Sequence, residues 1–209
     1  MVSKNGCFIV FEGIDGSGKS TQISLLKEHI EEHSINCMTT MEPSNGPIGT
    51  LLRQFLSGRI KGEETTLTAL FAADRLDHLN NPVNGIRKLL EDGSAVSSDR
   101  YVFSNYAYQS VSVPLEWIMK CNEMANETVR PDCHIFIDVA PETAMDRVSK
   151  GRHQTDIYET LDRLTDVRER YLDLIHRMED VEIIIIIDGN RPEKEIADDI
   201  WAKVCHYFV

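Results

Sequence analysis

Hydrophobic positions along the chain alternate between short continuous runs and longer stretches with helical spacing. The short runs have the length and composition of strands and cover residues 7–12, 36–40, 95–98, 133–138 and 182–187. Several are almost uninterrupted apolar runs, a pattern typical of strands covered on both faces. The five consecutive isoleucines at 183–187 are the clearest example, because β-branched side chains favour a strand over a helix of that length.

Between these runs, apolar residues recur at spacings of three and four, which predicts amphipathic helices over 20–32, 68–79 and 158–178. Strands that alternate with helices indicate crossover connections and therefore a parallel sheet. We expect an α/β three-layer sandwich in which a parallel sheet of about five strands has helices on both faces. The length and the lack of a linker or repeat predict one domain over 1–209.

The segment that follows the first strand is the main candidate for chemistry. Residues 13–20 read Gly-Ile-Asp-Gly-Ser-Gly-Lys-Ser and match the phosphate-binding pattern G-x-x-x-x-G-K-[ST] between a strand and a helix. A chance match in this length is on the order of one in a hundred. Its glycines let backbone N–H groups point at phosphate oxygens. We therefore predict ATP-phosphate contacts from Gly13, Ile14, Asp15, Gly16, Ser17, Gly18, Lys19, Ser20 and Thr21.

Two side chains of this loop have specific expected roles. Lys19 can reach the β- and γ-phosphates, and the Ser20 hydroxyl can ligate Mg²⁺. Neither a D-x-x-G switch nor an N-K-x-D base-reading motif follows the loop, which argues against a GTPase. The chain is also too short for a motor core with a coupling domain. A small-molecule kinase that uses ATP and Mg²⁺ is the class that remains.

Composition limits the classes of partner that the protein can bind. The net charge of −12 argues against a nucleic-acid surface, because phosphate backbones require a basic field. No apolar run approaches the ~20 residues that span a bilayer, and the first strand begins too early for a signal peptide. The five cysteines are scattered and form no C-x-x-C pair, as expected for reduced thiols. We expect a cytoplasmic protein that binds small-molecule nucleotides and neither nucleic acid nor membrane.

Three further segments point to a family. Residues 42–49 read Glu-Pro-Ser-Asn-Gly-Pro-Ile-Gly, residues 70–75 read Leu-Phe-Ala-Ala-Asp-Arg, and residues 99–109 begin Asp-Arg-Tyr. With Phe-Glu-Gly-Ile-Asp-Gly at 11–16, their order and spacing resembles thymidylate kinase over nearly the whole chain. The resemblance implies transfer of a phosphoryl group from ATP to dTMP with Mg²⁺, for dTTP synthesis. It also implies a homodimer, with the helix at 68–79 as a plausible interface.

The same resemblance implies an acceptor site. Phe71 would stack on the thymine ring, although a core phenylalanine is the alternative, and Arg75 would reach the base carbonyl edge, although a solvated helical arginine is the alternative. Asn105 and Tyr108 would contact the base and the sugar 2′ region, and a bulky Tyr108 would disfavour a ribose 2′-hydroxyl. Gln109 is an expected neighbour of these two residues.

Other implied roles concern the sugar and the transferred phosphate. Asp15 would bind the deoxyribose 3′-hydroxyl, Arg100 would bridge the donor and acceptor phosphates, and Asp99 would position Mg²⁺ through water. A structural surface ion pair of Asp99 and Arg100 is the alternative. Many bacterial members have an arginine where this chain has Met41. Without that arginine, Arg53 must provide more of the contact with the acceptor phosphate. Glu42 is then a weaker candidate for a substrate contact.

A mobile lid is expected at about 149–157, because a basic group must reach the negative charge on the transferred phosphate when the site closes. The phosphate loop contains no arginine, so Arg152 is the catalytic candidate and Arg147 the next choice, with a non-catalytic basic loop as the alternative. Tyr158 would cover the bound nucleotide. The expected catalytic set is therefore Lys19, Arg100, Arg152 and Asp15.

Two other functions stay open at this stage. A deoxynucleoside kinase, or a kinase for another nucleoside monophosphate, would use the same loop, and a nucleoside kinase would need Glu42 as the base. A nucleotide-binding regulator without turnover is the third possibility. Such a protein usually lacks the lysine or hydroxyl of the loop, whereas Lys19, Ser20 and Arg152 are all present here.

Overall fold

The computed structural model describes residues 6–151, 158 and 160–208. In this part of the chain, five parallel strands form one sheet in the order β2-β3-β1-β4-β5, which confirms the predicted fold class. The strands lie close to their predicted positions: β1 (Phe8–Glu12), β2 (Cys37–Met41), β3 (Ala95–Asp99), β4 (Cys133–Asp138) and β5 (Ile184–Asp188).

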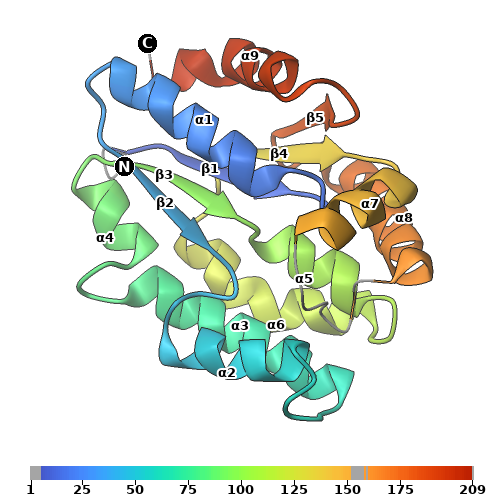
Figure 1. Ribbon diagram of the computed structural model, residues 1–209. Coiled ribbons are helices and arrows are strands. Elements are labelled where there is room, and N and C mark those ends of the chain that lie inside the picture. Colours follow the sequence, from blue (N-terminus) through green and yellow to red (C-terminus); the bar gives the residue numbers. More distant parts are fainter. Residues whose placement is uncertain (1–5, 152–157, 159, 209) are drawn as a thin grey trace.

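Helices cover both faces of the sheet (Figure 1). The upper layer in that view consists of α1 (Lys19–Glu32) and α9 (Glu193–Val204), followed by the short η1 (Cys205–Tyr207). The lower layer is built around four helices, α3 (Glu64–Asn80), α5 (Val102–Gln109), α6 (Leu115–Thr128) and α8 (Leu161–Met178). Three further helices pack at its edges: α2 (Pro47–Leu56), α4 (Ile86–Glu91) and α7 (Pro141–Gly151).

The central strand β1 positions the candidate site. All five of its residues are buried, and it pairs with β3 on one side and β4 on the other. Its register places Phe11 opposite Asp99, so the phosphate loop that follows β1 begins beside the end of β3. Ligands of α/β proteins bind at the carboxyl ends of parallel strands, and this is the edge where the loop lies.

Two details of the sequence interpretation need correction. The isoleucine run is not covered on both faces, because β5 is an edge strand: Ile183 is 58% exposed and Ile186 is 52% exposed. The helix predicted at 158–178 begins only at Leu161, where the Thr160 hydroxyl accepts a hydrogen bond from the Arg163 backbone N–H. A capping threonine ends the preceding loop there, whereas apolar periodicity alone does not mark that boundary.

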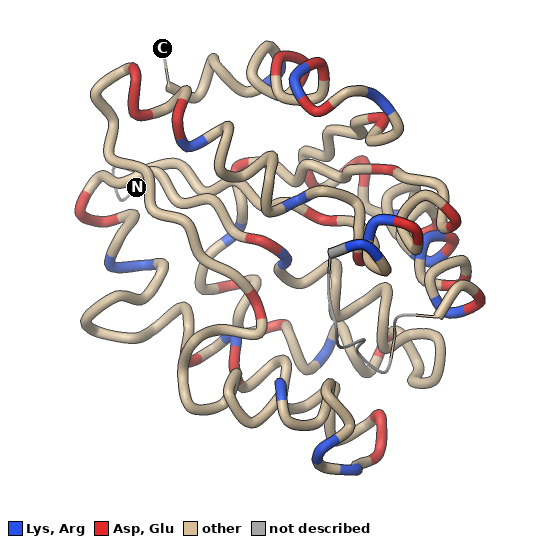
Figure 2. Tube along the Cα trace, viewed as in Figure 1, with Lys and Arg blue, Asp and Glu red and all other residues tan. Residues whose placement is uncertain are grey.

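Surface charge and thiols agree with a compact globular protein. Acidic and basic residues intermingle on α8 and α9 rather than separating into one-sign patches (Figure 2). None of the helices in the described part of the chain has both the length and the apolar content needed to span a bilayer. The cysteines are free thiols, and burial raises the pKa of Cys133 to about 12, which keeps it unreactive.

Candidate active site

A cavity of about 800 Å³ opens at the carboxyl ends of β1, β2 and β3. Its walls come from the phosphate loop, from α2 and α3, and from α5. The cavity collects the residues that the sequence singled out for the acceptor and the metal. Those that line it are Asp15, Ser20, Glu42, Arg53, Phe71, Arg75, Asp99, Arg100, Asn105, Tyr108, Gln109 and Tyr158.

The phosphate loop has the backbone geometry that its glycines predict. Gly16 has φ +79° and Gly18 has φ +95°, in the left-handed region that other residues rarely adopt. A Cβ at Gly16 would also lie 2.3 Å from the Ala144 carbonyl oxygen. Helix α1 begins at Lys19, and no described side chain caps its first turn. The first backbone N–H groups of α1 are therefore available to an anion at the positive end of the helix. Within the loop, the Asp15 N–H donates to the Tyr108 hydroxyl at 3.1 Å and the Ser17 N–H to the Ile14 carbonyl oxygen at 3.2 Å.

Lys19 lies across this loop. Its Nζ donates to the carbonyl oxygens of Gly13 at 3.1 Å and Ile14 at 3.0 Å and lies 4.0 Å from Asp99 Oδ1. Burial, together with the nearby Arg100 charge, lowers the pKa of Lys19 to about 8. A triphosphate would supply negative charge beside the ammonium and favour its protonated form.

Ser20 and Asp99 form a pair of oxygen donors at the end of β3. The Ser20 hydroxyl donates to Asp99 Oδ2 at 2.7 Å, across the junction of α1 and β3. Mg²⁺ prefers oxygen ligands and is commonly held by one or two protein groups together with phosphates and water. These two side chains fit that requirement, because both can turn toward a metal ion that is bound to the loop's phosphates.

Arg100, Asp15 and Tyr108 form a compact cluster next to the loop. Arg100 Nη2 donates to Asp15 Oδ1 at 2.6 Å, and the Tyr108 hydroxyl donates to Asp15 Oδ2 at 2.8 Å. Although burial would raise it, the charges of Arg100 and Lys19 lower the pKa of Asp15 to about 2. Asp15 is therefore a carboxylate at neutral pH and can accept a hydrogen bond from a sugar hydroxyl. Asp99 and Arg100 do not form the surface ion pair that was the alternative for them.

Arg75 is fully buried, so it is not a solvated helical arginine. Its Nη2 lies 2.5 Å from Glu42 Oε2 and 3.1 Å from the Tyr101 carbonyl oxygen, which fixes the guanidinium at the cavity wall. Glu42 also lies 3.4 Å from His78 Nδ1. Phe71, on the same helix, packs against the core and also lines the cavity.

The loop after β2 is held by contacts from α2 and α3. Arg53 Nη1 donates to the carbonyl oxygens of Pro43 at 3.0 Å and Ser44 at 2.7 Å. The buried Asp74 accepts hydrogen bonds from the Ser44 backbone N–H at 2.7 Å and the Ser44 hydroxyl at 2.6 Å. Met41 lines the cavity where an arginine was noted as missing. Arg53 lines the same cavity.

Comparison with known proteins decides the family. The family model described as thymidylate kinase matches residues 11–200. A thymidylate kinase of Symbiobacterium thermophilum is 37% identical over 92% of this chain and 90% of its own. Probable thymidylate kinases of Methanobrevibacter smithii (36%, covering 96% of this chain and 95% of theirs) and Methanocaldococcus jannaschii (37%, 92% and 93%) are also similar. The chain belongs to the thymidylate kinase family.

Within this site, sequence reasoning missed the buried Glu12. Its carboxylate accepts from the Tyr101 backbone N–H at 3.0 Å, from Ser104 Oγ at 2.5 Å and from the Tyr171 hydroxyl at 3.0 Å. Burial raises the pKa of Glu12, and the hydrogen bond from Ser104 opposes the shift. The Tyr101 N–H directly follows Arg100, whose φ of +76° is unusual for a non-glycine residue. Glu12 therefore helps hold Arg100 in place, and an acidic residue that ends a buried strand was the available signal.

A second missed residue, Arg163, supports the aromatic wall of the same site. Its guanidinium lies 4.9 Å from the centre of the Tyr158 ring, and its Nη2 donates to the Tyr108 carbonyl oxygen at 2.7 Å. Tyr158 is buried at the cavity, with its hydroxyl 3.2 Å from Gln109 Nε2. Arg163 lies in the first turn of α8, where a sequence pattern would assign it to the exposed face.

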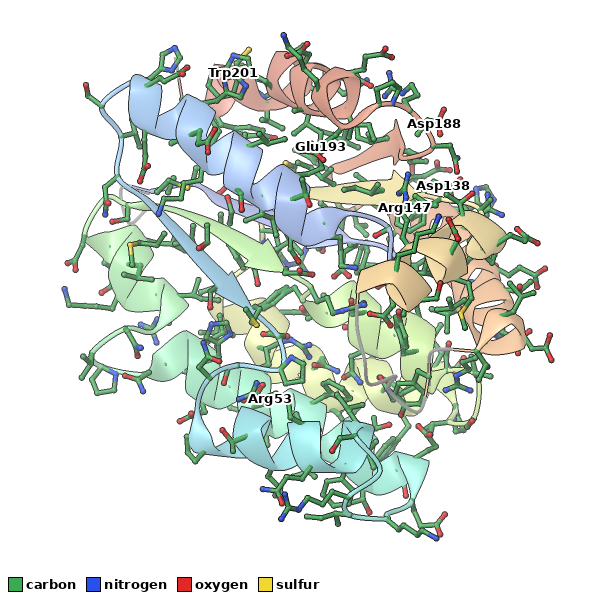
Figure 3. All side chains as sticks on the ribbon, in the orientation of Figure 1. Arg53, Asp138, Arg147, Asp188, Glu193 and Trp201 are labelled. Carbon is green, nitrogen blue, oxygen red and sulfur yellow. The ribbon has the colours of Figure 1, made fainter. Side chains whose placement is uncertain are left out.

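The expected lid at about 149–157 is described only at its start. Residues 149–151 form the last part of α7, whereas the catalytic candidate Arg152 lies outside the described residues. Tyr158, which follows the expected lid, is described. Arg147 lines the cavity and donates through Nη2 to the Gly189 carbonyl oxygen at 3.0 Å. Figure 3 shows it where α7 lies beside the ends of β4 and β5.

Proposed function

We propose that the chain transfers the γ-phosphoryl group of ATP to dTMP, giving ADP and dTDP for dTTP synthesis. The observation that carries the proposal is that one cavity joins a phosphate loop to an aromatic-lined acceptor space, in a member of the thymidylate kinase family. The relatives named as thymidylate kinases cover nearly the whole chain, so the donor and acceptor parts are both included in the similarity.

The residues suggest a direct in-line transfer without a covalent enzyme intermediate. Lys19 and the loop amides would hold the ATP phosphates, and Arg100 would bridge donor and acceptor phosphates from its position beside Asp15. Mg²⁺, held by Ser20 and through water by Asp99, would neutralise charge on the β- and γ-phosphates. The acceptor is already an ionised phosphate, so positioning and charge neutralisation would supply most of the catalysis.

The lid and the base pocket complete the proposed site. Arg152 would bring a further cation to the transferred phosphate when the lid closes, with Arg147 as the next candidate. Phe71 would stack on the thymine, while Arg75, Asn105 and Gln109 would face its polar edge. Tyr158 would cover the nucleotide.

The environment of Glu42 favours a monophosphate acceptor over a nucleoside. A nucleoside kinase needs a free carboxylate to remove a proton from a hydroxyl group. Glu42 is buried, and its Oε2 lies 2.5 Å from Arg75 Nη2. The carboxylate is therefore paired with the guanidinium and is not free to act as a base. A thymidine kinase activity would require that pair to separate.

Steady-state assays with ATP and a panel of acceptors test the proposal. Thymidine, dTMP, dUMP, dCMP, AMP and UMP are compared by kcat/KM. We expect a clear preference for dTMP, and preference for any other acceptor would remove the assignment. Tight ATP binding with no ADP formed under any acceptor would instead indicate a regulator without turnover.

We also propose that the protein is a cytoplasmic homodimer. Trp117 (41% exposed) and Met124 (67% exposed) lie seven residues apart on α6, on one helical face. Helix α6 packs beside α3, the helix expected at the interface. Light scattering should give twice the monomer mass, and Met124→Lys should shift it toward the monomer.

Free buried thiols fit a reducing compartment.

A further inference from the structure

A chain of side-chain hydrogen bonds runs along the acceptor part of the cavity. It starts at the buried Arg75 on α3, continues through three primary amides, and ends at a carboxylate near the start of the same helix. The links after Arg75 are Asn122 to Asn105 (2.8 Å), Asn105 to Gln109 (3.0 Å), Gln109 to Tyr158 (3.2 Å) and Tyr158 to Glu64 (2.9 Å).

The first amide can adopt only one orientation. Asn122 Oδ1 accepts a hydrogen bond from Arg75 Nη1, while its Nδ2 donates to the Ile118 carbonyl oxygen at 2.9 Å and to Asn105 Oδ1 at 2.8 Å. A guanidinium has no acceptor and a carbonyl has no donor. Rotating the Asn122 amide by half a turn would therefore oppose donor to donor and acceptor to acceptor in a fully buried place.

The orientation of the Asn122 amide fixes the orientation of the next two amides. Because Asn105 Oδ1 faces Asn122, Asn105 Nδ2 must donate to Gln109 Oε1, and Gln109 Nε2 must then face the Tyr158 hydroxyl. The other end agrees, since the Tyr158 hydroxyl donates to Glu64, which as a carboxylate has no donor. Arg75 at one end of this chain of hydrogen bonds and Glu64 at the other thus impose the same orientation on the Asn105 and Gln109 amides.

The direction decides what the wall offers to a ligand. A primary amide nitrogen carries two N–H groups, and those of Asn105 and Gln109 each use one within the chain, which leaves one each. Both residues line the cavity, and so does Arg75, whose Nε is buried without a hydrogen-bond partner in the described structure. Each amide oxygen likewise uses one of its two lone pairs within the chain of hydrogen bonds. Each of these two amides therefore keeps one donor and one acceptor, at ends that the direction of that chain fixes.

We propose that Asn122 is a positioning residue that sets base selectivity, by fixing which end of the Asn105 and Gln109 amides carries the donor and which the acceptor. The inference rests on the proposed transfer to a pyrimidine monophosphate. A pyrimidine with a carbonyl at position 4 presents an acceptor there and an N–H donor at position 3. A pyrimidine with an amine at position 4 reverses both groups, so amides held in the orientation that suits the first would oppose donor to donor and acceptor to acceptor with the second.

Asn122→Asp tests the inference, because a carboxylate there can accept from Arg75 but cannot donate to Asn105. The amides of Asn105 and Gln109 should then rotate by half a turn, so that Asn105 Nδ2 faces residue 122 and Gln109 Nε2 faces Asn105. We expect the ratio of kcat/KM for dTMP to that for dCMP to fall by at least about tenfold. The matched control is Asn126→Asp, one turn further along α6, where Asn126 Nδ2 donates only to the Tyr106 hydroxyl at 2.9 Å. Its ratio should stay within about twofold of the wild type.

The ratio separates positioning from a general loss of structure. If Asn122 only stabilises the fold, both kcat/KM values fall together and the ratio is unchanged, which would overturn the inference. If Asn122→Asp does not fold, Asn122→Ala, which removes the constraint on the Asn105 amide without adding a charge, must lower the same ratio. Failure of the proposed function shows separately, in the wild-type enzyme, as a missing preference for dTMP.

Discussion

His134 should make the stability of this protein sensitive to mild acid. The ring lies in the central sheet with 1% of its surface exposed and stacks on Phe103 with 4.1 Å between ring centres. Neither ring nitrogen has a hydrogen-bond partner in the described structure. Glu182 Oε2 is 3.9 Å from Nε2, beyond hydrogen-bond length, and that carboxylate is also 3.6 Å from Arg130. Burial therefore prevails and lowers the pKa of His134 to about 3.

The sign follows from where the proton binds. The unfolded chain takes up a proton at His134 near pH 6.5, whereas the native state does not until about pH 3. Unfolding is therefore favoured increasingly as pH falls below 6.5, and the loss continues toward pH 3. Integrated from pH 7 to pH 5, one such histidine removes about 2 kcal/mol of unfolding free energy.

Urea unfolding at several pH values between 7 and 5 measures this loss, with His134→Phe compared with the wild type. The phenylalanine keeps an aromatic ring against Phe103 and cannot bind a proton, so the pH dependence should weaken by about 2 kcal/mol over that range. His176→Phe is the matched control, because His176 is 83% exposed and solvent reaches it in both states. Equal pH dependence of His134→Phe and the wild type would refute the reasoning.

Three substitutions probe the transfer reaction. Lys19→Ala should lower kcat at least about a hundredfold, whereas Lys27→Ala, on the exposed side of the same helix, should not; near-normal turnover of the first would show that the loop is misassigned. Arg152→Ala should lower kcat more than it raises the KM for dTMP, and the opposite pattern would favour Arg147. Asp99→Asn should raise the Mg²⁺ concentration for half-maximal activity by about tenfold or more, and an unchanged requirement would exclude Asp99 from the metal site.

Local signals were sufficient to predict the sheet and the phosphate loop. Residues 13–20 are contiguous, and the conformations that they require, such as φ +95° at Gly18, depend on the residue type itself. Alternation of strands and helices likewise implied a parallel sheet, since parallel strands need crossover connections. The isoleucine run was misjudged because coverage of β5 depends on its place at the sheet edge, and the run itself carries no information about strand order.

The supports of the site could not be predicted in the same way. Glu12 meets Tyr171 across 159 positions of sequence, and Asn122 meets Arg75 across 47. Neither pair has a spacing that a helix or a strand would reveal. The resemblance to a family located Arg75 and Asn105 by their motifs, but Asn122, which is hydrogen-bonded to both, lies on α6, outside every motif that was identified.

The acidic net charge and the binding of anionic nucleotides are compatible because the cations of the cavity are held by carboxylates. Arg100 pairs with Asp15, Arg75 pairs with Glu42, and Lys19 lies 4.0 Å from Asp99. Burial and then the neighbouring Arg100 charge lower the pKa of Lys19, whereas the carboxylates of Asp99 and Asp15 oppose that shift. The carboxylates keep each cation charged and oriented before a nucleotide arrives. A phosphate group then meets a preorganised set of donors, so selectivity depends on this local arrangement rather than on the charge of the whole protein.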